Sequence, residues 1–269
     1  MAFLVFAVGL VAGFVDAIAG GGGLIMLPGL LFAGLPVGSA IATNKLCGTF
    51  GALTSTLKFA HGKQIDWTVC AWMALPVVIG AYVGSRSIEQ LPAAWAEPIV
   101  IALITAITAF IVLNPSFGVE EKEAEQSKQT APDQINNQIE TTANRAPFKR
   151  LFFSIIAGSI IGFHDGFFGP GTGIFLVFSL LWLWPMDFLK ATGTTKLLNL
   201  LTNVTALITF AFSGSIVYSL GTYGAVGVAI GAYIGTTFAT RKGAKFIRPI
   251  FIAVTTALVI RLAANYLSS

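Results

Sequence analysis

The chain has 269 residues, of which 55% are hydrophobic and only 10% are charged. About a quarter of the residues of an ordinary soluble domain are charged, so this composition excludes a soluble domain and predicts a polytopic membrane protein. The formal net charge of +4 does not point to a nucleic-acid partner, because the cationic residues lie between apolar segments, a pattern that orients membrane proteins.

The first half contains five apolar segments, judged against about 20 apolar residues for one crossing of a bilayer. They span residues 3–19, 24–33, 39–60, 65–84 and 94–113. The second is too short to cross comfortably, and it follows four consecutive glycines, Gly20 to Gly23. Glycine suits backbone that must leave a helix or approach a ligand closely. In lipid, such backbone is stable only where protein buries it or where it lines a cavity.

Residues 114–148 have a different composition, rich in charged, Gln, Asn and Thr residues and poor in large apolar ones. Such a stretch cannot offset the entropy lost on ordering, so we expect a polar, flexible linker on the cytoplasmic side. It separates a first transmembrane repeat at 1–113 from a second at 149–269. The apolar segments of the second half are 151–168, 171–184, 191–212, 216–237 and 246–267.

The two halves show the same landmarks in the same order, which indicates an internal duplication. The matching runs are GFVD at 13–16 with GFHD at 162–165, the glycine-rich stretches at 20–23 and 169–173, TNKL at 43–46 with TTKL at 194–197, and IGAYVG at 79–84 with IGAYIG at 230–235. Duplicated halves with glycine-interrupted segments at matching positions are typical of secondary transporters with a site near the membrane midplane. Structural repetition without transport is the alternative.

These motifs resemble the sulfite exporter TauE/SafE family of membrane transporters. The resemblance rests on the glycine-rich turn after Asp16, on Ala-Thr-Asn-Lys at 42–45, and on Gly-Pro-Gly-Thr-Gly at 169–173 with Thr-Thr-Lys at 194–196. It covers nearly the whole chain outside 114–148. It implies transport of a small anion, such as sulfite, an organosulfonate or a related organic acid, and it fixes neither the substrate nor the direction.

The glycine stretches and the two lysine-bearing segments form the candidate anion site. A helix that begins at a glycine turn presents backbone N–H groups and a positive dipole end. A lysine inside an apolar segment is costly, and it indicates function by default. The predicted substrate-binding residues are Gly21, Gly22, Gly23, Asn44, Lys45, Gly171, Thr172, Gly173, Thr194, Thr195, Lys196, Asn199 and Asn203. The alternatives are a tight turn that only permits helix packing, and lysines that extend to the membrane surface.

We expect Lys45 and Lys196 to face each other across the centre, each beside the glycine turn of its own half. The anionic group of the substrate would then lie among the two ammonium groups and the N–H groups of the turns. Asn199 and Asn203 share one helical face with Lys196, and this stripe either lines a pathway or joins helices by hydrogen bonds.

Three further polar residues lie at the ends of the segments that precede the glycine stretches. Asp16 and Asp165 could carry protons in coupled transport, pair with the lysines, or accept hydrogen bonds from the glycine turns. His164 has no counterpart at Val15, and we interpret it as a hydrogen-bonded polar group rather than a proton relay.

The sequence therefore predicts an all-α polytopic protein of the cytoplasmic membrane, with about 8–10 membrane segments in two homologous, inverted repeats. The loops at 61–64, 114–148 and 239–246 are expected on the cytoplasmic side, because the basic residues then share one face. The predicted function is secondary transport of a small anion. An anion channel, a membrane-embedded enzyme and an assembly subunit are the alternatives.

No nucleophile–base pair is visible, so we do not expect an enzyme. Cys47, Cys70 and the two histidines lack ligand-like spacing, so neither a disulfide framework, a metal nor a cofactor is expected. The lipid bilayer and the anion are the expected partners, and homo-oligomerisation is left open.

Overall fold

The computed structural model describes residues 1–92, 94, 95, 98–100, 102, 103 and 147–242. Every regular element among them is an α-helix, as predicted. The helices are α1 (Ala2–Ala19), α2 (Gly23–Phe32), α3 (Val37–His61), α4 (Trp67–Gln90), α8 (Pro147–Phe167), α9 (Thr172–Leu183), α10 (Phe188–Phe212) and α11 (Tyr218–Lys242). Most of the predicted segment 94–113, nearly all of the predicted linker 114–148 and the predicted segment 246–267 lie outside the described residues.

The glycine stretches interrupt the helices where the sequence predicts. Helix α1 ends at Gly20, which adopts the left-handed conformation at φ 73° and donates its N–H to the carbonyl of Asp16. In the second half, Gly169 (φ 97°) and Gly171 (φ 87°) occupy the turn between α8 and α9. These backbone angles favour glycine, because a Cβ atom there is strained. Each turn therefore folds a long helix back onto a short one.

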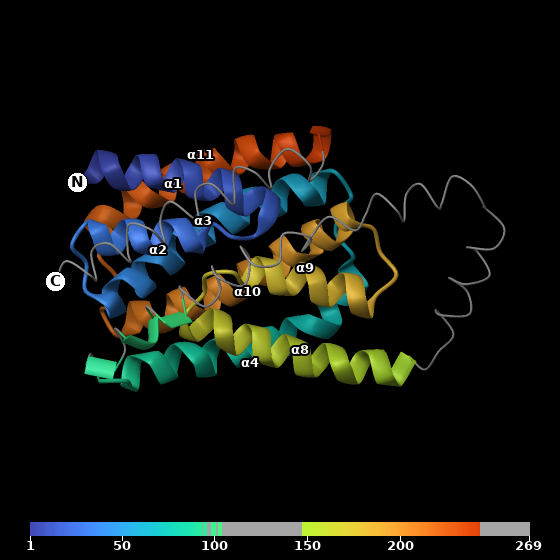
Figure 1. The fold of residues 1–269 in the computed structure, drawn as a ribbon. Coiled ribbons are helices and arrows are strands. Elements are labelled where there is room, and N and C mark those ends of the chain that lie inside the picture. Colours follow the sequence, from blue (N-terminus) through green and yellow to red (C-terminus); the bar gives the residue numbers. More distant parts are fainter. Residues whose placement is uncertain (93, 96–97, 101, 104–146, 243–269) are drawn as a thin grey trace.

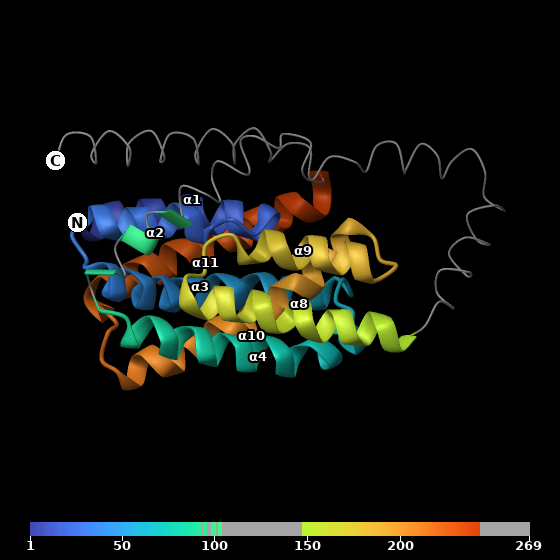
Figure 2. The same cartoon turned by 60° about the horizontal axis from the view of Figure 1, so that its bottom comes forward.

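The two short helices lie on opposite sides of the middle of the molecule. Figures 1 and 2 show α2 toward the end where α1 begins, and α9 toward the end where α8 begins. Helices α1 and α8 run in opposite directions along the long axis, and α3 and α10 do the same (Figure 1). The α1–α2 hairpin and the α8–α9 hairpin therefore approach the centre from opposite ends.

The long helices pack mainly across the two halves of the sequence. Helix α1 lies along α11, and α4 lies along α8. Glycines make both contacts possible, because a side chain at these positions would overlap with the backbone of the facing helix. Gly227 and Gly231 of α11 lie against α1, and Gly80 and Gly84 of α4 lie against α8. Small residues that allow close approach are typical of membrane helix interfaces, and these glycines have that role here.

Polar side chains lie inside this bundle, and large apolar side chains lie outside it. Lys45, Asn44 and Thr194 are buried, whereas Phe212 is 89% exposed and Trp182 is 80% exposed. This distribution suits a molecule whose surrounding solvent is lipid, because a soluble protein places charges outside. Among the described residues, α4 and α10 are both long and apolar enough to cross a membrane by themselves.

The loops at each end of the bundle are joined by matching contacts. At one end, the N–H of Asp66 donates to Thr194 Oγ1 at 3.0 Å, and Asp66 forms an ion pair with Lys190 at 3.2 Å. At the other end, the N–H of Val217 donates to Thr43 Oγ1 at 3.0 Å. Thr43 and Thr194 occupy corresponding positions in the two predicted repeats, as do Asp66 and Val217.

Candidate functional site

The tips of the two hairpins meet at the centre of the bundle. Gly20, at the tip of the α1–α2 hairpin, packs directly on Gly173 in the first turn of α9. A Cβ atom at Gly20 would lie 2.6 Å from the carbonyl carbon of Gly173, so a side chain has no room there. Gly23 similarly faces Pro170, with 3.1 Å between a Cβ atom at Gly23 and the Cα of Pro170. Absent side chains therefore let the two backbones touch.

A buried ion pair joins α3 to the end of α8. Lys45 Nζ lies 2.9 Å from Asp165 Oδ1, and the two side chains are 1% and 2% exposed. Lys45 Nζ also lies against Gly169, where a Cβ atom would be 2.7 Å from it. Glycine at this turn thus leaves the space that the ammonium group occupies.

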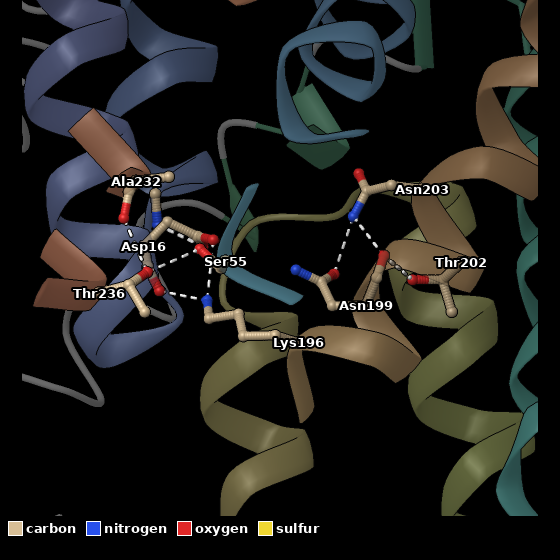
Figure 3. Close-up of polar contacts among 9 residues, drawn as sticks. Asp16, Ser55, Lys196, Asn199, Thr202, Asn203, Ala232 and Thr236 are labelled. Atoms are coloured by element: carbon tan, nitrogen blue, oxygen red, sulfur yellow. Dashed lines mark hydrogen bonds and ion pairs between the residues drawn. The ribbon is translucent and has the colours of Figure 1, made fainter. Parts of the chain in front are cut away.

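A second ion pair joins α10 to the end of α1 (Figure 3). Lys196 Nζ lies 2.9 Å from Asp16 Oδ2 and also donates to the carbonyl oxygen of Asp16. Asp16 Oδ1 in turn accepts a hydrogen bond from the N–H of Gly22 at 3.2 Å. Asp16 therefore both pairs with a lysine and holds a glycine turn, two of the roles that the sequence left open for it.

The lysines extend across the bundle rather than toward the turns of their own halves, so that expectation is wrong. Helices α3 and α10 pack against each other at the centre. Each lysine therefore reaches the hairpin of the other half, where an aspartate compensates its charge. Extension of the lysines to the membrane surface is also wrong, because Lys45 is 1% and Lys196 is 0% exposed.

A cavity of about 40 Å³ lies beside the Lys45–Asp165 pair, between the hairpin tips. A water molecule needs about 10–15 Å³ of such volume, so the cavity holds a few waters or one small anion. The predicted site residues that line it are Asp16, Gly22, Gly23, Asn44, Lys45, Asp165, Thr172, Gly173, Asn199 and Asn203. It thus collects groups from both hairpins and from both lysine-bearing helices.

The remaining predicted residues do not line the cavity. Lys196 is held by Asp16, and Thr194 accepts from Asp66 at the end of the bundle and donates to Lys190. Thr195 is buried, and its Oγ1 has no partner among the described residues. Gly21 and Gly171 belong to the turns themselves. Of the two lysines expected at one site, only Lys45 is among the residues that line the cavity.

His164 is only partly a satisfied polar group. Its Nδ1 lies 3.2 Å from Thr172 Oγ1, which in turn donates to the carbonyl of Gly169 at 2.7 Å. Its Nε2 is buried and has no partner in the described part of the chain. The ring thus supports the turn that precedes α9.

The polar stripe on α10 both lines the cavity and forms hydrogen bonds. Asn203 Nδ2 donates to the side-chain oxygen of Asn199 at 2.8 Å and to its carbonyl at 2.7 Å (Figure 3). Asn203 Oδ1 occupies the space beside Gly48, where a Cβ atom would be 2.7 Å away. Gly48 was missed as a site residue. The duplication could have identified it, because Gly48 corresponds in position to Asn199.

Other lining residues were also missed. They are Ala12, Gly20, Met26, Cys47, Gly169 and Val228. Apolar residues of this kind give no chemical signal in a sequence. Among the described residues, no group of three or more His, Cys, Asp or Glu side chains could hold a metal ion.

Comparison of the sequence with known proteins identifies the family of this chain. The family model described as sulfite exporter TauE/SafE matches residues 5–262. The chain belongs to the TauE/SafE family. The matched residues of this TauE/SafE protein include both glycine turns and both ion pairs. No solved structure matches the chain.

Several bacterial proteins similar to this chain are described as probable membrane transporters. A probable membrane transporter protein, ORF9, of Sinorhizobium sp is 35% identical over 98% of this chain and 93% of its own length. The probable membrane transporter protein YfcA of Escherichia coli is 30% identical over 96% of this chain and 88% of its own. A probable membrane transporter protein of Haemophilus influenzae is 30% identical over 94% of this chain and 90% of its own length. This TauE/SafE protein is therefore a member of a family of membrane transporters.

Proposed function

We propose that this protein is a multi-pass secondary transporter of the cytoplasmic membrane that carries a small anion through the central cavity. The observation that carries the proposal is the position of Lys45, a buried cation that lines a small cavity between two helix starts. The first residues of α2 and α9 line the same cavity, so the positive ends of both helix dipoles lie there, although the N–H groups of Leu24, Thr172 and Ile174 already donate to carbonyls of the turns. Cation and helix ends together favour an anion.

Reciprocal contacts support inverted repeats. Lys45 pairs with Asp165 while Lys196 pairs with Asp16, so the same bond is formed twice with the halves exchanged. The hydrogen bonds of Thr43 and Thr194 at the two ends of the bundle follow the same exchange. A pseudo-two-fold axis in the membrane plane produces this pattern, and such an axis places the substrate site near the midplane.

The two hairpins are the candidate re-entrant elements. Helix α2 has 10 residues and α9 has 12, which at 1.5 Å per residue is far less than a hydrocarbon core of about 30 Å. The hairpin turns contain non-helical backbone at the centre of the bundle, where protein buries it, as lipid requires. We infer that each hairpin enters from one face and returns to it.

The lining groups favour a compact oxyanion. Lys45 supplies a charge, and Asn44 and Asn199 supply amide groups at the cavity wall. A volume of about 40 Å³ admits a group the size of sulfite or the head of a sulfonate or carboxylate. The family description names sulfite export, which places sulfite and organosulfonates first among the substrates to test.

The cavity also favours a carrier over an anion channel. An open pore needs a continuous wet path, whereas this cavity is small and lies between contacting backbones and buried ion pairs. Purified protein in proteoliposomes should accumulate labelled sulfite or methanesulfonate against its gradient when a pH gradient is imposed. Movement of the anion only down its own gradient would favour the channel.

The proposed role of Lys45 can be tested by binding. Removing one partner from a buried, charged contact costs about 2–5 kcal/mol, and 1.4 kcal/mol corresponds to about tenfold. Lys45→Ala should therefore weaken binding of sulfite or methanesulfonate by about thirtyfold or more. Lys45→Arg should restore little, because the guanidinium is larger and bonds with a different geometry.

Lys190→Ala is the matched control, because it removes the same charge from an ion pair that is partly exposed at the end of the bundle. Binding by Lys190→Ala should equal that of the parent. Equal binding by the parent and by a folded Lys45→Ala variant would contradict the central site.

A further inference from the structure

The two ion pairs are unequal in how completely their carboxylates are bonded. Asp16 has both carboxylate oxygens engaged, Oδ1 by the N–H of Gly22 and Oδ2 by Lys196. Asp165 has only Oδ1 engaged, at 2.9 Å from Lys45. Asp165 Oδ2 is buried and has no partner among the described residues, although the side chain is 2% exposed and lines the cavity. Asp165 therefore has one carboxylate oxygen at the cavity wall that accepts no hydrogen bond from the described residues.

The charges around the cavity sum to zero before any anion enters. Two ammonium groups face two carboxylates, in the pairs Lys45–Asp165 and Lys196–Asp16. An added anion would leave one negative charge uncompensated in a low-dielectric site, and such a charge is strongly unfavourable. The anion must also compete with Asp165 for the same ammonium group. A proton on one carboxylate removes both difficulties.

We infer that Asp165 takes up a proton at Oδ2 when the anion binds Lys45, so that one proton crosses the membrane with each monovalent anion. This inference rests on the anion-transport function proposed above. The proton comes from water on the side from which the anion enters, and it forms an O–H bond on Asp165. Lys45 remains an ammonium and pairs with the anion in place of the carboxylate. The loaded site is again neutral, and both solutes leave together.

The surrounding titratable groups favour Asp165 over the other candidates. Asp16 is held by two donors, and protonation would break its bond to Lys196 or to the turn. His164 also has a buried ring nitrogen, Nε2, without a partner among the described residues, but His164 is not among the residues that line the cavity, and its Nδ1 lies on Thr172 of the α9 turn. Of the other titratable groups on the helices around α8, Cys47 of α3 lines the cavity and donates to the carbonyl of Gly221. On α4, Cys70 lies near the carbonyl of Thr194, Tyr82 is exposed, and Arg86 and Glu89 pair with each other.

Calorimetry of the full-length protein tests the inference directly. Methanesulfonate is the probe, because it does not titrate near neutral pH. Its heat of binding, measured in buffers of different ionisation enthalpy, gives the number of protons taken up. The parent should take up about one proton per anion, and its affinity should fall by about tenfold per pH unit once Asp165 is ionised in the free protein.

Variants assign the proton to one carboxylate. Asp165→Asn resembles the protonated side chain, so it should bind methanesulfonate without proton uptake and without the pH dependence. Asp66→Asn, which changes a partly exposed carboxylate at the end of the bundle, should still take up about one proton and is the control for charge alone. Uptake that persists in Asp165→Asn would overturn the assignment.

The parent protein separates this inference from the function on which it rests. Binding of methanesulfonate by the parent with no proton uptake would overturn the proton inference and leave the anion site standing. Failure of the parent to bind methanesulfonate, sulfite or acetate would overturn the proposed anion site, and the proton inference with it.

Discussion

The Lys45 ammonium and the Asp165 carboxylate lie 2.9 Å apart and are almost completely removed from solvent. Desolvation of two charges offsets most of their attraction, so such a pair contributes little net stability. Loss of one partner is different, because it leaves the other charge buried and uncompensated. At the scale of single residues, these pairs therefore constrain which substitutions the protein tolerates more than they stabilise the fold.

A double-substitution cycle measures this dependence. Lys45→Met should lower the free energy of unfolding by about 3–5 kcal/mol, whereas Lys45→Met with Asp165→Leu should recover most of the loss. Lys190→Met removes the ion pair with Asp66, in which the two side chains are 40% and 25% exposed. It should lower the free energy of unfolding by less than about 1 kcal/mol. Thermal unfolding of the purified variants in detergent gives the comparison. A double variant as unstable as Lys45→Met would contradict the dependence.

Gly20 offers a second test at the same scale, with Gly34 as its match. Both glycines have a positive φ, 73° and 90°, but a Cβ atom added at Gly34 would have no neighbour within 4 Å, whereas one at Gly20 would overlap with Gly173. Gly34→Ala should cost about 1–2 kcal/mol from backbone strain alone. Gly20→Ala should cost a further 1–3 kcal/mol, roughly, because the hairpin tips must separate. The same thermal assay applies, and equal losses would show that the tips do not touch.

At the scale of helices, the contacts that decide the arrangement are those between the two halves. Helices α1 and α11 approach closely because glycines face carbonyl groups, and α4 and α8 do the same. Small residues of this kind let dispersion and weak hydrogen bonds act between backbones where lipid gives no hydrophobic drive. A larger side chain in place of an interface glycine should therefore destabilise the packing, whether that side chain is polar or apolar.

Gly231→Leu tests the α1–α11 interface. Its side chain would overlap with the Leu10 carbonyl, so α11 must shift, and we expect a large loss of monodisperse protein on size-exclusion chromatography. Gly38→Leu is the control, because nothing lies within 4 Å of that position. Similar yields of the two variants would contradict the packing role of Gly231.

The helix breaks, the small-residue interfaces and most of the cavity-lining residues could be predicted from the sequence, because each leaves a local signal. Four glycines in an apolar run, or a lysine inside one, stand out without any knowledge of the fold. The partner of each lysine could not be predicted. Asp16 and Asp165 both lie near a glycine turn, and only the packing of α3 on α10 decides which carboxylate each lysine reaches.

At the scale of the whole molecule, the basic residues outside the centre concentrate at one end. The ends of α3 and α11 and the starts of α8 and α10 lie together there (Figure 1). The described basic residues at this end are Lys58, Lys63, Lys149, Arg150, Lys190, Arg241 and Lys242, and Arg86 lies at the other. From the positive-inside rule we predict that the first end faces the cytoplasm.

Cysteine labelling in membrane vesicles tests that orientation. Lys63→Cys and Lys242→Cys should react with an impermeant reagent from the cytoplasmic side only, and Ser213→Cys, in the loop before α11, from the opposite side only. Cys47 and Cys70 are buried, so the parent should give a low background. Labelling of residues 63 and 242 from opposite sides would contradict the inverted arrangement.

The crosswise pairing of lysine and aspartate bears on how such a molecule can originate. One half alone carries a lysine and an aspartate that do not meet each other. Two identical copies inserted in opposite orientations would satisfy both charges at once, in two equivalent bonds. A dual-topology homodimer would therefore have both charges paired without a second kind of subunit, and fusion of two such copies would allow the two ion pairs to diverge. After fusion, one ion pair could keep a structural role, while substitutions around the other pair could allow it to open and close during transport.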